Sequence, residues 1–198
     1  MEGGRVIRSL FHKNPDFIGI YDNALSKKEC EILINQFEKS PDLVKGETLN
    51  GYNPTLKESV DLLCSFNDKS VISNIVEPKL NSYLKLYKTE YSSLDKRCSK
   101  WKYYDEFNFQ KYDGENDGYK IWHCEHGPEG EASKRILAWM FYLNDAKSGT
   151  DFWHFPKVNG KMGRCVIFPS FWTHMHKGIT PNIGLKYIIT GWVSFTND

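Results

Sequence analysis

The N-terminal half of the chain carries apolar residues at helical spacing. Ser26 and Glu29 match a capping box, in which each side chain satisfies a backbone amide at a helix start. Behind this pair, one face carries Cys30, Leu33, Ile34 and Phe37. Because these positions follow the i, i+3, i+4, i+7 pattern, the sequence predicts a helix over about 26–39.

A second helix is predicted over about 70–92, again from one apolar side. That side carries Val76, Leu80, Tyr83, Leu84 and Tyr87. Pro78 lacks an amide hydrogen and clashes with the preceding turn, so we expect it to delay the start of this helix or to kink it. Residues 17–21 are predicted to form a short strand, and the turn-rich stretch 41–54 is predicted to be a loop.

From residue 107 onward the pattern changes to short runs of β-branched and aromatic residues separated by turn sequences. The predicted strands are 107–112, 119–125, 135–143, 150–155, 164–168 and 185–195. Helices followed by strands indicate an α+β protein, with a double-stranded β-helix (jelly-roll) core and the N-terminal helices packed on one sheet. We expect a single domain over 1–198, with mainly helical support in 1–106 and the jelly-roll core in 107–198.

Composition limits the expected partners and location. The net charge is +1, so we expect neither nucleic acid nor a membrane surface as a partner. The N-terminus lacks the apolar run of a signal peptide, and no stretch approaches membrane-spanning length. The cysteines are Cys30, Cys64, Cys98, Cys124 and Cys165. Their odd number and scattered positions favour reduced thiols, so we expect a cytoplasmic protein of a bacterium or of a virus-infected host.

Candidate metal ligands lie at the end of one predicted strand. His123 and Glu125 are two positions apart, so both side chains would project from the same face of that strand toward one metal ion. A third ligand would come from a distant strand, where His174 and His176 are both candidates. Two histidines and one carboxylate leave three positions open, as non-haem Fe(II) oxygenases require. An H-x-E pair alone also fits an exposed strand end with a solvated glutamate.

A lysine follows in an apolar strand sequence, LKYIITGW, ten positions after His176. A buried ammonium without a partner is very costly, so Lys186 would need a charged group beside it. The carboxylate of a bound 2-oxo acid would satisfy that need. The alternative is a lysine that points to solvent from an alternating strand.

Several segments resemble the prolyl 4-hydroxylase-like branch of the Fe(II)/2-oxoglutarate-dependent dioxygenases. They are FQKYDGENDGYKIWHCE (109–125), RILAWMFYLND (135–145), SGTDFWHF (148–155) and FPSFWTHMHKGITPNIGLKYIITGW (168–192). The stretch FIGIYDNALSKKECEILINQF (17–37) is similar to the opening strand and helix of that family, so the resemblance covers nearly the whole chain. The motifs occur in order and at the family's spacing, which is more specific than any single motif.

The resemblance implies that His123, Glu125 and His176 are the iron ligands. Family members place the last histidine about ten residues before a basic residue, which selects His176 and leaves His174 as a neighbour. Two departures from the family pattern stand out. The carboxylate ligand is Glu where Asp is commoner, and the basic residue is Lys where Arg is commoner, so Lys186 would act as a point charge.

The resemblance also implies contacts to the co-substrate and the substrate. The residues expected to bind or surround 2-oxoglutarate are Tyr112, Tyr142, Lys186 and Trp192. Arg135 and Tyr119 are expected to meet the substrate. The implied cofactor is Fe(II), with 2-oxoglutarate and O2 as co-substrates and ascorbate as a reductant. The implied reaction is hydroxylation of a substrate C–H bond, with peptidyl proline as the first expectation, and release of succinate and CO2.

Other functions and substrates stay open from the sequence. The same fold serves non-catalytic jelly-roll modules that bind a metal or ligand, and cupin-type metal proteins such as isomerases or sugar-binding proteins. A cupin-type protein would not require Lys186. A free amino acid, another protein side chain or a small metabolite are alternatives to peptidyl proline. Residues 41–69 and 126–134 are expected to form the substrate rim.

Overall fold

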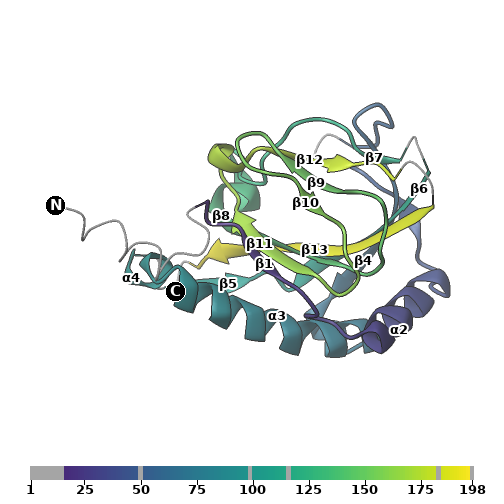
Figure 1. Cartoon of the computed structure of the whole chain (residues 1–198), viewed down its shortest axis with the longest axis horizontal. Coiled ribbons are helices and arrows are strands. Elements are labelled where there is room, and N and C mark those ends of the chain that lie inside the picture. The colour runs from purple at the N-terminus through teal and green to yellow at the C-terminus, as the bar shows by residue number, and fades with distance from the viewer. Residues whose placement is uncertain (1–15, 49–50, 98–99, 115–116, 182–183, 197–198) are drawn as a thin grey trace.

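The computed structural model describes residues 16–48, 51–97, 100–114, 117–181 and 184–196. The strands are β1 (Gly19–Tyr21), β2 (Val44–Lys45), β3 (Lys57–Glu58), β4 (Val60–Ser65), β5 (Trp101–Tyr103), β6 (Glu106–Asp113), β7 (Gly118–Tyr119), β8 (Arg135–Tyr142), β9 (Gly149–Phe152), β10 (Val158–Asn159), β11 (Cys165–Pro169), β12 (His176–Ile179) and β13 (Leu185–Phe195). The helices are α2 (Lys27–Glu38), α3 (Val71–Glu90) and α4 (Ser93–Arg97), with short 3-10 helices η1 (Phe66–Asp68), η2 (Gly130–Lys134) and η3 (Trp172–His174). The architecture is α+β with a jelly-roll core, as the sequence predicts (Figure 1).

Antiparallel sheets form the walls of the jelly roll. The larger sheet has the strand order β1-β11-β8-β13-β6-β4-β2, and β5 also pairs with β13. The smaller sheet has the order β10-β9-β12, and a separate ladder joins β3 to β7. Helices α2 and α3 run beneath the larger sheet, on the side away from the smaller one (Figure 1). An isolated bridge joins His123 to His176, the first residue of β12.

Alternation along the central strands divides the apolar core in two. In β8, Leu137, Trp139 and Phe141 belong to the cluster that also contains the buried residues of α2 and α3. The intervening Ala138, Met140 and Tyr142 belong to a second cluster, together with Phe152 of β9 and Val158 of β10. Because successive strand residues point to opposite faces, one strand supplies both clusters. The second cluster lies inside the jelly roll, between its sheets.

Helix α2 confirms the prediction from the capping box. Ser26 Oγ accepts a hydrogen bond from Glu29 N at 3.3 Å, and the Glu29 carboxylate accepts one from Ser26 N at 2.7 Å. Cys30, Leu33 and Phe37 are fully buried on its predicted apolar face. The capped start and the buried face together hold this helix against the larger sheet.

Helix α3 begins at Val71, so the late start expected from Pro78 is wrong. Pro78 lies inside the helix, and its ring costs about 3 kcal/mol or more in a helix interior. Val76, Leu80, Leu84 and Tyr87 are all buried on the predicted side of this helix. Their burial is worth about 1.5–3 kcal/mol for each large apolar side chain, which outweighs the cost of the proline.

Two predicted strands are longer in the sequence analysis than in the structure. The predicted strand 119–125 is wrong beyond Tyr119, because β7 ends there and the following residues run irregularly to the site. The predicted strand 150–155 ends at Phe152. Strand β4 was not predicted, because Asp61 occupies one of its buried positions and masks the apolar alternation.

The N-terminal part of the chain also contributes to the jelly roll. Strands β1, β2, β4 and β5 all join the larger sheet, so residues before 107 supply sheet as well as helical support. Among the described cysteines, Cys30, Cys64, Cys124 and Cys165 are free thiols, and Cys98 lies outside the described residues. No helix in the described part of the chain has the length and apolar character needed to cross a membrane.

Candidate active site

Three side chains from two distant segments of the chain converge inside the jelly roll. His123, Glu125 and His176 each place one nitrogen or oxygen atom within 4.8 Å of the other two. Glu125 Oε1 lies 3.5 Å from His123 Nε2 and 3.3 Å from His176 Nε2. The backbone bridge brings the histidines together, since each donates its N–H to the carbonyl of the other, at 2.9 and 2.8 Å. A single metal ion can be reached by all three side chains.

Backbone carbonyls orient both imidazole rings. His123 Nδ1 lies 3.0 Å from Ile121 O, and His176 Nδ1 lies 2.9 Å from His174 O. A carbonyl only accepts, so each Nδ1 must donate, and in the neutral form that binds a metal ion each Nε2 carries a lone pair. Both lone pairs are therefore available on the side where Glu125 Oε1 lies.

The second oxygen of Glu125 is held away from the histidines. Trp192 Nε1 donates a hydrogen bond to Glu125 Oε2 at 2.7 Å, and Arg135 Nη1 lies 3.7 Å from the same atom. The Arg135 guanidinium in turn lies over the Trp192 ring, 3.7 Å from its centroid. Burial acts to raise the pKa of Glu125, but the hydrogen bonds and charges of His123 and His176 outweigh it and hold that pKa well below its usual value. Glu125 is thus a carboxylate whose Oε2 is hydrogen-bonded to Trp192, while Oε1 is available to bind a metal ion.

The donor set fits Fe(II): two imidazole nitrogens and one carboxylate oxygen lie on one side of a single point. The expectation that His123 and Glu125 reach this point from one strand is wrong, because neither lies in a strand. Backbone bonds anchor this irregular segment instead. His123 is fixed by the bridge to His176, and Glu125 N donates to Ser170 O at 3.0 Å.

The sequence analysis placed His174 and His176 on one strand, and this prediction is wrong. His174 is the last residue of η3, whereas His176 begins β12. His174 Nε2 lies 2.7 Å from Asp16 O, and its Nδ1 lies 2.9 Å from Thr173 Oγ1. Both ring nitrogens are therefore engaged outside the three-residue cluster. Burial lowers the pKa of His174, which favours its neutral form.

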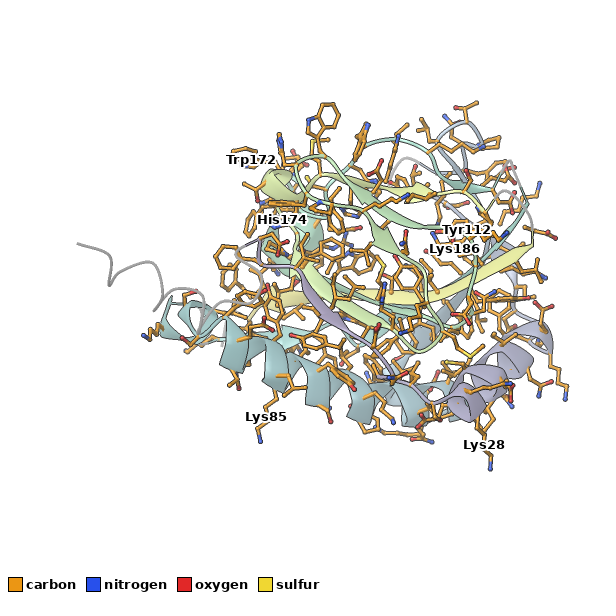
Figure 2. All side chains as sticks on the ribbon, in the orientation of Figure 1. Lys28, Lys85, Tyr112, Trp172, His174 and Lys186 are labelled. Carbon is orange, nitrogen blue, oxygen red and sulfur yellow. The ribbon has the colours of Figure 1, made fainter. Side chains whose placement is uncertain are left out.

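Lys186 lies inside the jelly roll rather than at its surface (Figure 2). It is only 4% exposed, and its Nζ donates to Gly149 O at 3.0 Å. The ring centroids of Tyr112 and Tyr142 lie 5.1 and 5.9 Å from Nζ. No carboxylate in the described part of the chain forms an ion pair with it, and burial lowers its pKa to about 8. This ammonium lacks the counter-charge that its burial demands.

The two tyrosines beside Lys186 are neutral hydroxyls. Tyr112 Oη donates to Gln110 Oε1 at 2.9 Å, and the Tyr142 and Thr150 hydroxyls share a hydrogen bond of 2.6 Å. Burial raises the pKa of Tyr142 to about 12 and that of Tyr112 well above its usual value. Both hydroxyls therefore keep their protons at neutral pH, and each could donate to an anion beside Lys186 if it turned away from its present partner.

A cavity of about 290 Å³ opens at the three-residue cluster. It is lined by Glu47, Thr48, Lys57, Asn108, Gln110, Tyr119, His123, Cys124, Glu125, His126, Gly127, Arg135, Thr190 and Trp192. Tyr119 and Arg135, predicted to meet the substrate, and Trp192, predicted to surround 2-oxoglutarate, all line this cavity, and the Tyr119 ring stacks on His123 at 3.7 Å between centroids. Tyr112, Tyr142 and Lys186 do not line this cavity and lie deeper in the jelly roll.

Several polar residues of this cavity were not identified from the sequence. Asn108, Gln110 and Thr190 point inward because they alternate with core residues on β6 and β13. That alternation was the available signal, since polar residues recur at every second position of otherwise apolar strands. Lys57 gave no such signal, because it lies in a two-residue strand whose burial depends on tertiary packing. Glu47 and Thr48 fall in the segment expected to form the substrate rim.

Comparison with known proteins agrees with this geometry. A sequence model described as the 2OG-Fe(II) oxygenase superfamily matches residues 107–194. A search of curated protein sequences found no match.

Three solved structures share the fold. A viral collagen prolyl hydroxylase from Paramecium Bursaria Chlorella virus-1, solved as its 2OG complex, is 20% identical with a TM-score of 0.69, covering 92% of this chain and 98% of that one. A Trichoplax adhaerens prolyl hydroxylase in complex with a hypoxia inducible factor peptide fragment is 15% identical, with a TM-score of 0.71 and coverage of 98% and 94%. A Pseudomonas putida prolyl-4-hydroxylase is 13% identical, with a TM-score of 0.68 and coverage of 91% and 94%.

The matched segment includes all the residues to which the sequence analysis assigned a site role, from Tyr112 to Trp192. Those residues lie in and around one cavity and one buried lysine, on a fold that solved prolyl hydroxylases share. Over residues 107–194 the chain is similar to the 2OG-Fe(II) oxygenase superfamily, and its fold is the one that the solved prolyl hydroxylases share.

Proposed function

We propose that this oxygenase hydroxylates a prolyl residue of a peptide or protein, with Fe(II) held by His123, Glu125 and His176. The observation that carries the proposal is the pairing of two incomplete sites. Three ligand atoms lie within 4.8 Å of one another, and the deeper Lys186 ammonium has no counter-charge among the described residues. A metal ion completes the first site and a dicarboxylate completes the second.

Lys186 would hold the far carboxylate of 2-oxoglutarate, and the hydroxyls of Tyr112 and Tyr142 would turn from Gln110 and Thr150 to donate to it. The Lys186 ammonium would gain the counter-charge that it lacks, and it would contact the carboxylate as a point charge rather than as a fork. When bound, Fe(II) and 2-oxoglutarate supply the oxidising chemistry that transfers oxygen from O2 to a substrate C–H bond, with succinate and CO2 as co-products.

The residues around the cluster would position the substrate and exclude water. Arg135 lines the cavity, so its guanidinium is placed to donate to a substrate oxygen. Tyr119 and Trp192 supply aromatic surface on two sides of the cavity. A proline ring needs an apolar contact, and its flanking peptide groups need donors, so this mixture of surfaces suits a prolyl peptide.

A peptide substrate is further supported by the solved structures of the same fold, which are named as prolyl hydroxylases, one of them bound to a peptide fragment. The non-catalytic alternative is disfavoured because the metal-binding trio and the buried lysine are both present. Ascorbate as a reductant and a cytoplasmic location remain part of the proposal. The free thiols at the described cysteines are consistent with a reducing compartment.

Anaerobic titration tests the cofactor chemistry without knowledge of the substrate. Apo-protein would be titrated first with Fe(II) and then with 2-oxoglutarate, while the weak visible charge-transfer band of a 2-oxo acid chelated to ferrous iron is recorded. The band should appear in the wild type and be absent in His123→Ala. A folded wild-type protein that gives no band would contradict the proposed function. Mass spectrometry of a proline-containing peptide after aerobic incubation then tests for a gain of one oxygen atom.

A further inference from the structure

One wall of the cavity contains a buried lysine to which the proposed function gives no role. Lys57 lies in β3, is 3% exposed, and lines the same cavity as His123 and Glu125. Its Nζ donates to Asp61 Oδ2 at 2.6 Å and to Glu47 O at 3.2 Å. A buried charge beside a proposed metal centre needs a reason, since replacing such an ion pair with apolar residues is often neutral or stabilising.

The position of Lys57 is fixed by a buried hydrogen-bond chain. Asp61, 7% exposed, accepts from Ser59 Oγ at 2.7 Å and from Gln110 Nε2 at 3.0 Å, in addition to Lys57. Gln110 Oε1 in turn accepts from Tyr112 Oη at 2.9 Å. Hydrogen bonds through Asp61 and Gln110 therefore connect Lys57 in the cavity wall to Tyr112 beside Lys186. These bonds restrict the orientation of the Lys57 ammonium.

The Lys57 ammonium has a donor to spare. An ammonium carries three N–H donors, and the described residues accept only two of them. Because Lys57 lines the cavity, the third donor is available to a molecule inside it. Arg135 lines the same cavity, so two cationic side chains lie in its wall.

We propose that Lys57 is a substrate-binding residue, that Asp61 is its positioning residue, and that the group Lys57 takes is a neutral carbonyl oxygen of a peptide. The inference rests on the proposed function. Asp61, at 2.6 Å, already balances the charge of Lys57, so a substrate carboxylate would gain little attraction and would face the Asp61 carboxylate nearby. A peptide carbonyl accepts the spare hydrogen bond without that repulsion.

The competing explanation is a purely structural ion pair, and equilibrium binding separates the two. Anaerobic protein loaded with Fe(II) and 2-oxoglutarate would be titrated by calorimetry with an N-acetylated, C-amidated peptide of repeated Pro-Pro-Gly units. Lys57→Met should raise the Kd for this peptide about ten- to a hundred-fold, the effect of losing a hydrogen bond to a charged group. The charge-transfer band with 2-oxoglutarate should be unchanged.

Two further variants keep the experiment decisive. Lys57→Met/Asp61→Asn removes both charges, keeps an acceptor oxygen for Gln110 and offers an amide donor to the Ser59 hydroxyl, which protects folding if the single variant leaves Asp61 unpaired. It should show the same loss of peptide affinity. Lys111→Met is the matched control, because Lys111 pairs with Glu38 at 2.9 Å and does not line the cavity. It should bind the peptide like the wild type.

Each other outcome overturns the inference. Wild-type peptide affinity in a folded Lys57→Met or double variant would make the ion pair structural only. If Lys57→Met weakened the binding of free proline more than that of the blocked peptide, Lys57 would be a ligand for a substrate carboxylate instead. Failure of the wild-type protein to bind the peptide would contradict the inference as well. The proposed cofactor chemistry is tested separately by the charge-transfer band, because that band needs no substrate.

Discussion

Trp192 donates its indole hydrogen to Glu125 Oε2 at 2.7 Å, while Glu125 Oε1 faces the Nε2 atoms of both histidines. The indole therefore decides which carboxylate oxygen is free. The longer side chain of glutamate has one more torsion than aspartate, and a fixed partner for Oε2 removes part of that freedom. The Glu that departs from the family's usual Asp is thus held in place by a tryptophan from β13.

Replacing Trp192 by Phe should weaken metal binding about ten- to a hundred-fold, because the Glu125 carboxylate loses the partner that orients it. Fe(II) affinity would be measured by anaerobic competition with a chelating dye. Trp172→Phe is the control, since Trp172 is 73% exposed and forms no part of the cavity lining. Equal affinities in the two variants would show that the hydrogen bond has no role in the site.

Histidine substitutions test which of two neighbours binds the metal. His176→Ala should abolish Fe(II) binding, because it removes one of the three converging ligand atoms. His174→Ala should keep the metal and lower thermal stability, because both nitrogens of His174 already have partners in Thr173 and Asp16. The same dye competition and a melting curve give both readouts, and the opposite ranking would transfer the ligand role to His174.

Lys186→Met should raise the 2-oxoglutarate concentration needed for half-saturation by about a hundred-fold or more, because the far carboxylate loses its cation. Fe(II) affinity should change little, since Lys186 does not belong to the metal-binding trio. The charge-transfer band, titrated with 2-oxoglutarate in excess Fe(II), measures the first effect. Loss of iron binding in this variant would contradict the assigned role.

The burial of Lys186 predicts a pH dependence of stability. Its pKa falls from 10.5 to about 8 in the folded apo-protein, so the folded state binds fewer protons than the unfolded chain between these pH values. The free energy of unfolding should therefore rise with pH across this window, and the penalty is fully present below about pH 8. Lys186→Met apo-protein should be more stable than wild type at pH 7, by on the order of 3 kcal/mol, with the gap closing toward pH 10. Urea unfolding at both pH values checks this, and a constant gap would contradict it.

Deprotonation of Lys186 should also weaken the binding of 2-oxoglutarate. The neutral amine cannot pair with a carboxylate, so 2-oxoglutarate affinity should fall as pH rises through about 8. Lys186→Arg is the comparison, because a guanidinium stays charged throughout this range. If wild type and Lys186→Arg lose affinity in parallel above pH 8, another group controls binding.

Helix α3 offers a matched pair for stability. Leu84 is 4% exposed and Leu86 is 51% exposed, two positions apart in the same helix. Leu84→Ala should cost about 2–5 kcal/mol because it leaves a cavity under the larger sheet. Leu86→Ala should cost less than about 1 kcal/mol, since its side chain is half exposed. Denaturant unfolding monitored by circular dichroism measures both changes. Similar losses of unfolding free energy in the two variants would contradict the burial of Leu84 against the larger sheet.

Local sequence determined the elements with a strong period or cap. The Ser26–Glu29 capping box fixed the start of α2, and the apolar face from Cys30 to Phe37 is buried as predicted. The long strands β8 and β13 were predicted within a residue because most of their positions are apolar or aromatic. These features depend only on the spacing of residues along the chain, so they can be predicted from the sequence alone.

Spacing also identified residues that the fold brings together. His123, Glu125 and His176 were selected by resemblance and converge within 4.8 Å, and the apolar neighbours of Lys186 indicated that it is buried. The means of convergence was predicted incorrectly, because a backbone bridge and Ser170 O, rather than a shared strand, fix the first two ligands. Such contacts join residues about fifty positions apart, and no local pattern encodes them.

The sequence by itself indicated the resemblance to the oxygenases, helices α2 and α3, the central strands and the identity of the converging side chains. Only the tertiary structure decided that Trp192 holds one oxygen of Glu125 and that Lys57, paired with Asp61, forms part of the cavity wall. It also decided that His174 is engaged elsewhere. The physical reason is common to all three. A polar side chain acquires its role from the partner that meets it after burial, and that partner comes from another strand or loop of the folded chain.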